Sequence, residues 1–259
     1  NAACFLYELL TNDVWGLAGS PSLIDVTVFR AVGAVLAGEE FGLSLQQTDQ
    51  TDAQEIINEV LRHIDGALYV EPSTGIITLS LVRADYDPDE LLEIDDDAII
   101  DMEEFFRPGP SGLANKVFLR YIDRAQSYQQ KPAIAVDLAG VQSLGGVVPQ
   151  DMSFLGISNA ALAQRIAARE LKAVAFPFAT IRLKVNRKAW QLRPGSPFKF
   201  SFAPLGIEGM VCRVVRMSLG PITDGIIRLE AVEDAFGVDW TAYSPPAPSQ
   251  WVNPIPPPS

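Results

Sequence analysis

The residue types that most often carry enzymatic or metal chemistry are scarce in this sequence. His63 is the only histidine, and Cys4 and Cys212 lie far apart, without the CxxC spacing of a zinc or redox site. Catalytic triads and most zinc sites use an imidazole together with further ligands or partners, so both are disfavoured. We expect both cysteines to be buried small hydrophobic residues. We expect His63 to lie on the flank of a helix, beside its apolar stripe, as a surface or edge histidine.

An acidic segment offers a second kind of chemistry. Residues 85–104 contain eleven carboxylates and neither lysine nor arginine. Asp95 and Asp97 are candidate calcium ligands, although the EF-hand spacing is absent. Asp101 and Glu104 are a candidate pair for glycoside hydrolysis, which needs two carboxylates facing each other across a cleft. A solvated acidic face explains the segment more simply, so we predict no catalytic, cofactor-binding or metal-binding residue in this chain.

Aromatic and basic residues of the second half are further candidates for binding. Trp190 with Phe198, Phe200 and Phe202 is a candidate stacking platform for sugars or nucleic acid, but phenylalanines at every second position are typical of the inner face of a sheet. Four basic residues are candidates for contact with DNA phosphates or, more simply, for the outward face of a strand: Arg182, Lys184, Arg187 and Lys188. The glycines, Gly145 and Gly146 among them, lack the spacing of a nucleotide-binding loop and are predicted to form turns.

Composition indicates a folded protein with two electrostatically different halves. The 259 residues are 48% hydrophobic and 20% charged, with a net charge of −12. Residues 1–106 hold 3 basic and 22 acidic side chains, whereas residues 107–259 hold 17 and 10. This division suits two domains, or a subunit that meets unlike neighbours in an assembly. Short apolar runs and the lack of a signal peptide favour a soluble protein, and the start at Asn1 leads us to expect a piece of a longer chain.

Hydrophobic periodicity predicts helices and then a hairpin in the first half. Apolar residues recur at helical spacing over residues 3–10, 25–36 and 52–64, and Gly38 is a plausible stop for the second helix. The third helix is the clearest, because Thr51 and Gln54 match a capping box ahead of its apolar stripe. Two strand-like runs, at residues 67–70 and 76–82, flank turn residues and predict a hairpin.

Strands dominate the second half. Proline and glycine at residues 107–112 mark a boundary, after which residues 116–122 are rich in strand-forming types. Residues 158–174 are predicted to form a helix with Ser158 as its N-cap. Alternation of apolar and polar residues then predicts strands, which would form an antiparallel sheet or a small barrel: residues 181–185, 198–202, 210–218 and 227–231.

These elements predict an α+β fold, with an N-terminal helix-plus-hairpin module and a C-terminal antiparallel β-barrel or sheet with one packed helix. We place an acidic α+β module at residues 1–107 and a β-barrel domain at residues 108–240. Residues 241–259 are expected to be a proline-rich linker or strap, because the last sixteen residues hold seven prolines and cannot continue a sheet.

Several short motifs occur in an informative order. The chain opens with Asn1 and Ala2, and continues with YELLTN at residues 7–12, WGL at residues 15–17, and Ile24, Asp25 and Phe29. After the amphipathic helix that leads to Gly75 come Asn115, Val117, Tyr121 and Asp123, and then the turn LRPGS at residues 192–196. This order, over most of the chain, resembles the hub and tail-tip proteins of long-tailed bacteriophages, prophages and gene transfer agents, although Ala2 and Ser196 replace the commoner proline and aspartate.

The resemblance implies a structural protein of the virion tail, made in the bacterial host cytoplasm, and not an enzyme. It implies that residues 108–240 form a tail-tube-like β-barrel domain. Its partners would be further copies of itself, as a trimer, other tail proteins, and DNA passing through the tail channel; it would connect the tail tube to tip or fibre components. Two alternatives stay open, a peptidoglycan-cleaving module that uses Asp101 and Glu104, and a carbohydrate-binding module that uses Trp190.

Overall fold

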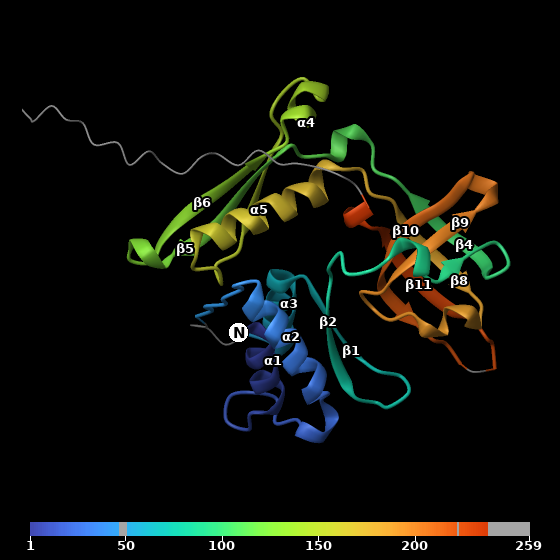
Figure 1. Cartoon of the computed structure of the whole chain (residues 1–259), viewed down its shortest axis with the longest axis horizontal. Coiled ribbons are helices and arrows are strands. Elements are labelled where there is room, and N and C mark those ends of the chain that lie inside the picture. Colours follow the sequence, from blue (N-terminus) through green and yellow to red (C-terminus); the bar gives the residue numbers. More distant parts are fainter. Residues whose placement is uncertain (47–50, 222, 238–259) are drawn as a thin grey trace, which may run out of the picture.

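The structure is a computed structural model that describes residues 1–46, 51–221 and 223–237. Its elements form two bodies that lie side by side (Figure 1). The first combines the N-terminal helices and a hairpin with a three-stranded sheet and a long helix, and the second is a curled six-stranded sheet. The predicted α+β fold is confirmed. Of the two C-terminal structures predicted, a β-barrel or a sheet, the chain forms a curled sheet. The proline-rich segment expected at residues 241–259 lies outside the described residues.

Three helices and a hairpin make up the N-terminal part of the first body. The helices are α1 (Ala2–Thr11), α2 (Val26–Gly38) and α3 (Ala53–Ile64), and the hairpin pairs β1 (Gly66–Val70) with β2 (Ile77–Leu81). α1 packs on α2 and α3, while β2 packs on α2. Buried leucines at helical spacing carry the packing of α1, as the periodicity predicted: Leu6, Leu9 and Leu10.

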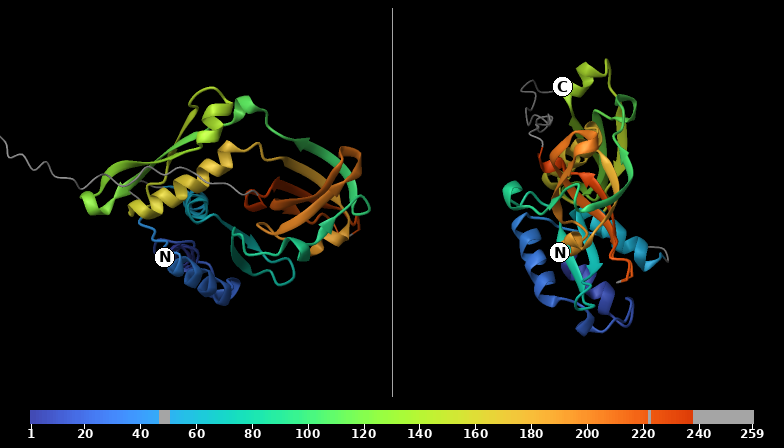
Figure 2. Two further views of the ribbon diagram at one scale, coloured as in Figure 1. Left: turned by 45° about the horizontal axis from the view of Figure 1, so that its top comes forward. Right: turned by 90° about the vertical axis from the view of Figure 1, so that its right-hand side faces the viewer.

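A three-stranded sheet covered by one helix completes the first body. β5 (Lys116–Asp123) lies in the middle, antiparallel to β6 (Gln129–Val136) and parallel to β7 (Pro149–Ser153). The short helix α4 (Leu138–Ser143) connects β6 to β7, and α5 (Ala160–Ala175) packs along β5 and β6 (Figure 2). Alternate side chains of β5 are buried and join α5 and the N-terminal helices in one continuous core: Val117, Leu119 and Tyr121.

Two helix caps differ by one residue from the predicted ones. Asp52, and not Thr51, caps α3, because its carboxylate accepts a hydrogen bond at 2.9 Å from the amide two residues later. Asn159, and not Ser158, caps α5 in the same way at 2.8 Å. Such a side chain replaces a hydrogen bond that the first turn of a helix cannot make by itself. Since neighbouring residues of similar chemistry compete for this position, sequence alone leaves the boundary uncertain by a residue.

The second body is a sheet in the order β3-β9-β10-β11-β8-β4. Its strands are β3 (Glu93–Ile94), β4 (Ile99–Phe106), β8 (Thr180–Val185), β9 (Pro197–Phe202), β10 (Ile207–Ser218) and β11 (Ile227–Glu233). All neighbours are antiparallel except β3 and β9. Short 3₁₀ helices occur in the connections: Pro21–Leu23, Pro88–Glu90, Pro110–Gly112, Arg124–Gln126, Arg187–Gln191, Ala203–Leu205 and Ala235–Gly237.

Chain connectivity forces this sheet to curl. The two edge strands, β3 and β4, are adjacent in sequence, and only residues 95–98 separate them. A flat six-stranded sheet would place its edges about 24 Å apart, at about 4.8 Å per strand spacing. The five steps from Ile94 to Ile99 reach at most about 18 Å. The edges must therefore approach each other, and irregular registers in β4 and β10 bend the strands to allow it (Figure 1).

Each body has its own hydrophobic core, and both cores draw on residues from either side of position 107. The first core unites α1, α2 and α3 with β5 and α5, and the second unites Ile94 and Ala98 with side chains of β8 to β11. β3 and β4, which precede position 107, pair with strands that follow it. The domain division at residues 107 and 240 stays a prediction, and the described packing crosses its first boundary.

Candidate functional site

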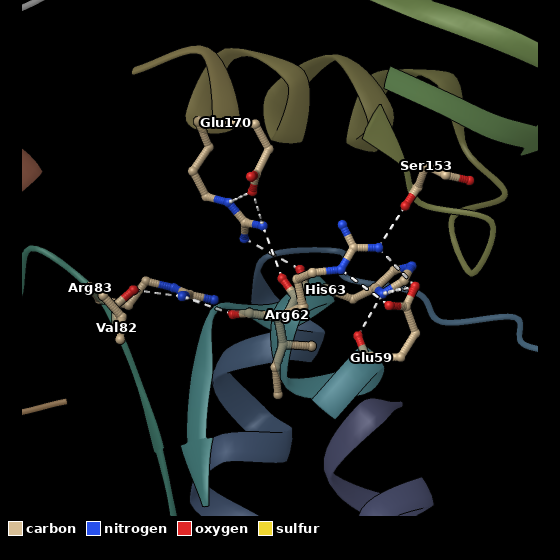
Figure 3. Close-up of polar contacts among 9 residues, drawn as sticks. Glu59, Arg62, His63, Val82, Arg83, Ser153 and Glu170 are labelled. Carbon is tan, nitrogen blue, oxygen red and sulfur yellow. Dashed lines mark hydrogen bonds and ion pairs between the residues drawn. The ribbon is translucent and has the colours of Figure 1, made fainter. Parts of the chain in front are cut away.

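The single histidine lies inside the structure, where α3 meets the loop that follows β7 (Figure 3). His63 is 0% exposed, so the prediction of a surface or edge histidine is wrong. Its Nδ1 lies 2.7 Å from the carbonyl oxygen of Glu59, and its Nε2 lies 3.3 Å from the amide nitrogen of Gly156. Because an amide N–H can only donate, Nε2 carries no proton, and the imidazole is neutral with its proton on Nδ1. Burial lowers the pKa of His63, which agrees with this geometry.

We expect the stability of the protein to fall as the pH drops below about 6.5, where an unfolded histidine takes up a proton. The pKa of His63 is lowered in the folded chain, so between the two pKa values the unfolded state binds more protons and the free energy of unfolding decreases with falling pH. The variant His63→Gln should flatten this part of the profile in thermal melts. Since the chain has no other histidine, an unchanged slope in the variant would contradict the assignment.

Arg62 fastens the same end of α3 to the loop after β7. Its guanidinium donates to the Glu59 carboxylate at 2.9 and 3.1 Å and to the Ser153 carbonyl oxygen at 2.6 Å (Figure 3). It also lies 4.0 Å from the ring centre of Phe154, a distance at which a cation is attracted to the face of an aromatic ring. The ring of His63 meets Phe154 edge-on at 5.0 Å. Phe154 is therefore held between a cation and an imidazole.

Arg169 of α5 caps the other side of this helix end. It donates to the carbonyl oxygens of Arg62 and His63 at 3.2 and 3.3 Å, and Glu170 holds its guanidinium at 2.7 Å. The last carbonyls of a helix have no partner within it and carry partial negative charge, so a cation there is favourable. The contact joins α3 to α5 across the first core.

A second arginine, Arg83, connects several elements close to this end of α3. Arg83, after β2, forms a two-pronged ion pair with Glu39, which follows α2, at 2.7 and 2.9 Å. It also donates to the carbonyl oxygens of Ile64 and Val82, while Arg165 of α5 donates to the carbonyl oxygen of Glu39 at 2.6 Å. The Arg83 guanidinium lowers the pKa of Glu39. The ends of α2, α3 and β2 thus meet α5 at one charged cluster.

A buried ion pair connects this region to the curled sheet. Arg213 of β10 donates to the Asp234 carboxylate at 2.8 Å, and both side chains are nearly inaccessible, 7% and 3% exposed. Arg213 also donates to the carbonyl oxygens of Gly195 and Arg83, and the Tyr86 hydroxyl donates to Asp234 at 2.8 Å. Burial, together with the Asp234 carboxylate, raises the pKa of Tyr86 to about 12. The pair ties β10, the end of β11 and the connection after β2 together.

A half-buried ion pair ties the hairpin to the curled sheet. Arg193 donates to both carboxylate oxygens of Glu71 at 2.7 Å, a planar geometry that arginine favours. The Arg193 hydrogen bonds lower the pKa of Glu71 to about 2. The turn at residues 192–196, one of the motifs noted in the sequence, therefore carries a structural contact.

This pair makes a second prediction about acid stability. Glu71 has a lowered pKa when folded, so its stabilising contribution is present above the usual pKa of 4.5 and is lost as the pH falls toward about 2. Urea unfolding between these pH values should show a shallower loss of stability for Glu71→Gln than for the natural chain. Glu208→Gln, at an exposed position in β10, is the matched control and should keep the natural slope. Equal slopes in all three proteins would refute the role of Glu71.

The acidic segment is paired with basic residues and is not simply solvated. Four ion pairs of 2.8 to 2.9 Å cross from it to β8 and the following turn: Asp95 with Lys188, Asp101 and Glu103 with Lys184, and Glu104 with Arg182. The register between β4 and β8 places Asp101 opposite Lys184 and Glu104 opposite Arg182, where opposite charges attract. Within the described residues, no group of three or more His, Cys, Asp or Glu side chains is arranged to hold a metal ion.

The aromatic candidates divide between core and surface. Phe198 and Phe200 are fully buried in the second core, and Phe202 packs against it, as predicted for an inner sheet face. Trp190 is 42% exposed on a 3₁₀ helix, with the Arg193 guanidinium 5.8 Å from its ring centre. The phenylalanines and Trp190 therefore do not form one exposed platform.

The two cysteines, Gly145 and Arg187 lie in different parts of the structure and do not form a common site. Cys212 is buried in the curled sheet as predicted, and burial raises the pKa of its thiol. Cys4 is exposed, so the prediction that both cysteines are buried is wrong for it. Gly145 has a φ of +70°, which fits the predicted turn, and Arg187 donates to the carbonyl oxygen of Pro221.

Arg213 and Asp234, the most buried ion pair described above, were not predicted from the sequence. A signal was present, because Arg213 interrupts an otherwise apolar stretch of a predicted strand. A charge in such a position is stable only with a buried partner. The sequence offers many acidic residues and does not indicate which one is the partner.

The polar contacts described above all join elements of the chain to one another. None of the helices in the described ranges combines the length and the apolar character needed to cross a lipid bilayer. Residues 52–217, well over half of the chain, match the protein family described as "Putative phage tail protein". The chain therefore belongs to this family of phage tail proteins, and it is a structural component of the virion tail, as the order of its motifs predicted.

Three solved structures are similar to this chain at low sequence identity. The virion of a native gene transfer agent (GTA) particle contains a chain 19% identical, with a TM-score of 0.49, over 75% of this chain and 41% of that one. The tail protein from Neisseria meningitidis MC58 is 14% identical, with a TM-score of 0.48, over 74% and 58%. The 43 kDa tail protein of prophage MuSo2 from Shewanella oneidensis is 11% identical, with a TM-score of 0.48, over 80% and 66%. The present chain thus spans 41% to 66% of their lengths. No curated protein matches the chain significantly.

Proposed function

We propose that this chain is part of a tail-tip or baseplate-hub subunit, which connects the tail tube to tip or fibre components through protein–protein contacts. Membership of a phage tail family supports the tail role. The position at the distal end is supported by the ordered motifs that resemble hub and tail-tip proteins, among them residues 7–12 and 192–196. The proposal includes assembly as a trimer and passing contact with DNA in the channel.

The β6 edge of the three-stranded sheet supports a role in assembly. Among the described strands, β6 pairs only with β5, so one side of its eight residues has no strand beside it. Such an edge presents unpaired backbone N–H and C=O groups to which a neighbouring subunit can add a strand. The edge strand β4 is instead lined by ion-paired acidic residues, a pattern that opposes uncontrolled pairing.

Labelling of intact tails tests the proposed place. Gold-conjugated antibody fragments raised against the protein should mark the end of the tail farthest from the head in electron micrographs. Chemical cross-linking of isolated tails should trap three copies of the full-length protein. Labels along the tube or at the head junction would refute the tip position. The coding sequence should also lie beside a tape-measure gene and other tail genes, and the absence of any tail gene there would count against the proposal. Control micrographs of particles from a deletion strain should show no label.

The absence of catalytic activity is a separate part of the proposal. Asp101 and Glu104, the pair considered for peptidoglycan cleavage, are bound to Lys184 and Arg182 and lie on one strand. Incubation of the full-length protein with cell-wall material should therefore release no fragments. Turnover that is lost in Glu104→Gln would overturn this part. A glycan array should likewise show no saturable binding that depends on Trp190.

A further inference from the structure

A loop at the end of the N-terminal helices exposes three apolar side chains. Residues 12–19 follow α1, and Val14 is 88% exposed while Trp15 and Leu17 are each 52% exposed. Asp13, beside them, is also exposed, and it forms no ion pair within the residues that the structure describes. Apolar side chains that gather on an exposed surface are a common mark of contact with another protein.

Hydrogen bonds hold this loop in one conformation, although its apolar side chains face solvent. The Asn12 side chain accepts hydrogen bonds from the amides of Val14 and Trp15 at 2.9 and 3.2 Å. The amide of Leu17 donates to a carbonyl oxygen of α1 at 2.8 Å, and the Trp15 ring stacks on Phe5 with ring centres 6.0 Å apart. A loop fixed in this way loses little conformational freedom when it binds, which favours affinity.

The backbone of the loop is strained at one position and crowded at another. Ala18 has a φ of +53°, in the left-handed region that is costly for a residue with a Cβ. A Cβ at Gly16 would lie 2.5 Å from the Leu9 carbonyl oxygen, so only glycine fits there. The chain therefore keeps a costly geometry that presents Trp15 and its neighbours to solvent.

The outer face of the three-stranded sheet has the complementary chemistry. α5 packs on one face of β5 and β6, and on the other face Phe118 lies opposite Ile134, with both side chains partly exposed. The Lys116 amine lies 4.6 Å from the Phe118 ring centre and forms no ion pair among the described residues. Arg120 and Asp151, also on this face, pair at 3.2 Å, but both are more than half exposed, so the pair contributes little. Lys116 is thus a free cation beside an apolar centre.

The loop and the sheet face lie at opposite ends of the first body. α5 lies between the sheet and the N-terminal helices, and the loop lies at the end of these helices away from the sheet (Figure 1). The loop therefore cannot reach the sheet of its own copy. Residues 1–71 contain 11 acidic and 2 basic side chains, whereas residues 113–175, the sheet with α5, contain 4 and 7. Two copies that meet head to tail bring these opposite charges together.

We propose that the loop at residues 12–19 of one copy binds the outer face of the three-stranded sheet in a second copy. Trp15 packs on Phe118 and Ile134, and Asp13 lies close to Lys116. Tryptophan is enriched among the residues that carry most of the binding energy at protein interfaces. The contact joins two different surfaces, so each copy keeps one free surface of each kind unless a ring closes. The inference rests on the proposed assembly of several copies, and not on their place at the distal end of the tail.

Photo-cross-linking in isolated tails tests the contact. The full-length protein carries the photoreactive residue benzoylphenylalanine in place of Trp15, and half of the copies are labelled with heavy isotopes. We expect peptides of mixed isotope composition that link position 15 to residues 116–136 of a second copy. Links to another tail protein or to a different part of this chain would overturn the proposal, and so would the lack of any link.

Two controls accompany the cross-link. Benzoylphenylalanine in place of Phe106, which is 56% exposed on β4, should not reach residues 116–136. The antibody labels at the tail end and the three-copy products report the proposed function separately. If these remain and position 15 gives no link to the sheet, the contact proposed here is wrong and the tail-tip function stands.

Charge reversal gives an independent measurement. Asp13→Lys and Lys116→Glu should each lower the yield of the link from position 15 about tenfold, because like charges would then face each other. The double variant should recover most of the yield, since it forms the pair in the opposite sense. Glu208→Lys, at an exposed position in β10, should leave the yield unchanged. Equal yields in all variants, or no recovery in the double variant, would refute the contact between Asp13 and Lys116.

Discussion

Replacing Asp234 by alanine should lower the free energy of unfolding by about 3 to 5 kcal/mol, the usual effect of breaking a buried ion pair by removing one partner. The Arg213 guanidinium would keep its charge but lose the carboxylate at 2.8 Å, in a place where solvent reaches only 7% of its side chain. The Tyr86 hydroxyl would lose its acceptor in the same step. Urea unfolding measures the loss directly.

An exposed ion pair supplies the control for this change. Glu104 pairs with Arg182 at 2.9 Å, with both side chains about half exposed, so Glu104→Ala should cost only about 0 to 1 kcal/mol. The double variant Arg213→Met with Asp234→Leu should recover much of the loss, because it removes the unpaired charge as well as its partner. If Asp234→Ala and Glu104→Ala lower the free energy of unfolding by the same amount, the Arg213–Asp234 ion pair does not stabilise the contact between the two bodies.

Phe154→Ala should destabilise the protein by a similar amount, about 3 to 5 kcal/mol, through the cavity that it leaves in a tightly packed core. The ring is fully buried, meets the His63 ring at 5.0 Å and lies 4.0 Å from the Arg62 guanidinium. Its loss removes the packing partner of both side chains at the end of α3. Thermal melts with calorimetry give the size of the effect.

Phe106→Ala is the matched control for Phe154→Ala. Phe106 lies in β4 and is 56% exposed, so Phe106→Ala should change stability by less than about 1 kcal/mol. Comparable losses in the two variants would show that Phe154 is not a core residue. Combining Phe154→Ala with His63→Gln should cost less than the sum of the single changes, because residues in contact do not contribute independently.

Sequence patterns were sufficient where one element is stabilised by its own periodicity. The apolar stripe of residues 52–64 became α3, the alternating phenylalanines became the inner face of β9, and the turn residues between β1 and β2 became a hairpin. In each case one face must be buried whatever its partner is, so local spacing specifies the element. The ordered motifs also identified the family, because they are local as well.

Other features were outside the reach of local patterns. β6 includes Pro132, which argues against a strand in sequence; the sheet accepts it because β6 lies at an edge in the described structure. The acidic segment was interpreted as a solvated face, yet β4 lies beside β8, whose lysine and arginine pair with three of its eleven acidic residues. These outcomes depend on which strands become neighbours across long stretches of chain.

The sequence by itself therefore determined the helices α1, α2, α3 and α5, most of the strands, the scarcity of catalytic groups and the family. The tertiary structure alone decided that His63 is buried, that Cys4 is exposed, and that Asp234 is the partner of Arg213. The physical reason is the same in each case. Burial and charge pairing depend on which distant segment covers a side chain, and here the loop after β7 covers the flank of α3 that its own periodicity left outside the apolar stripe.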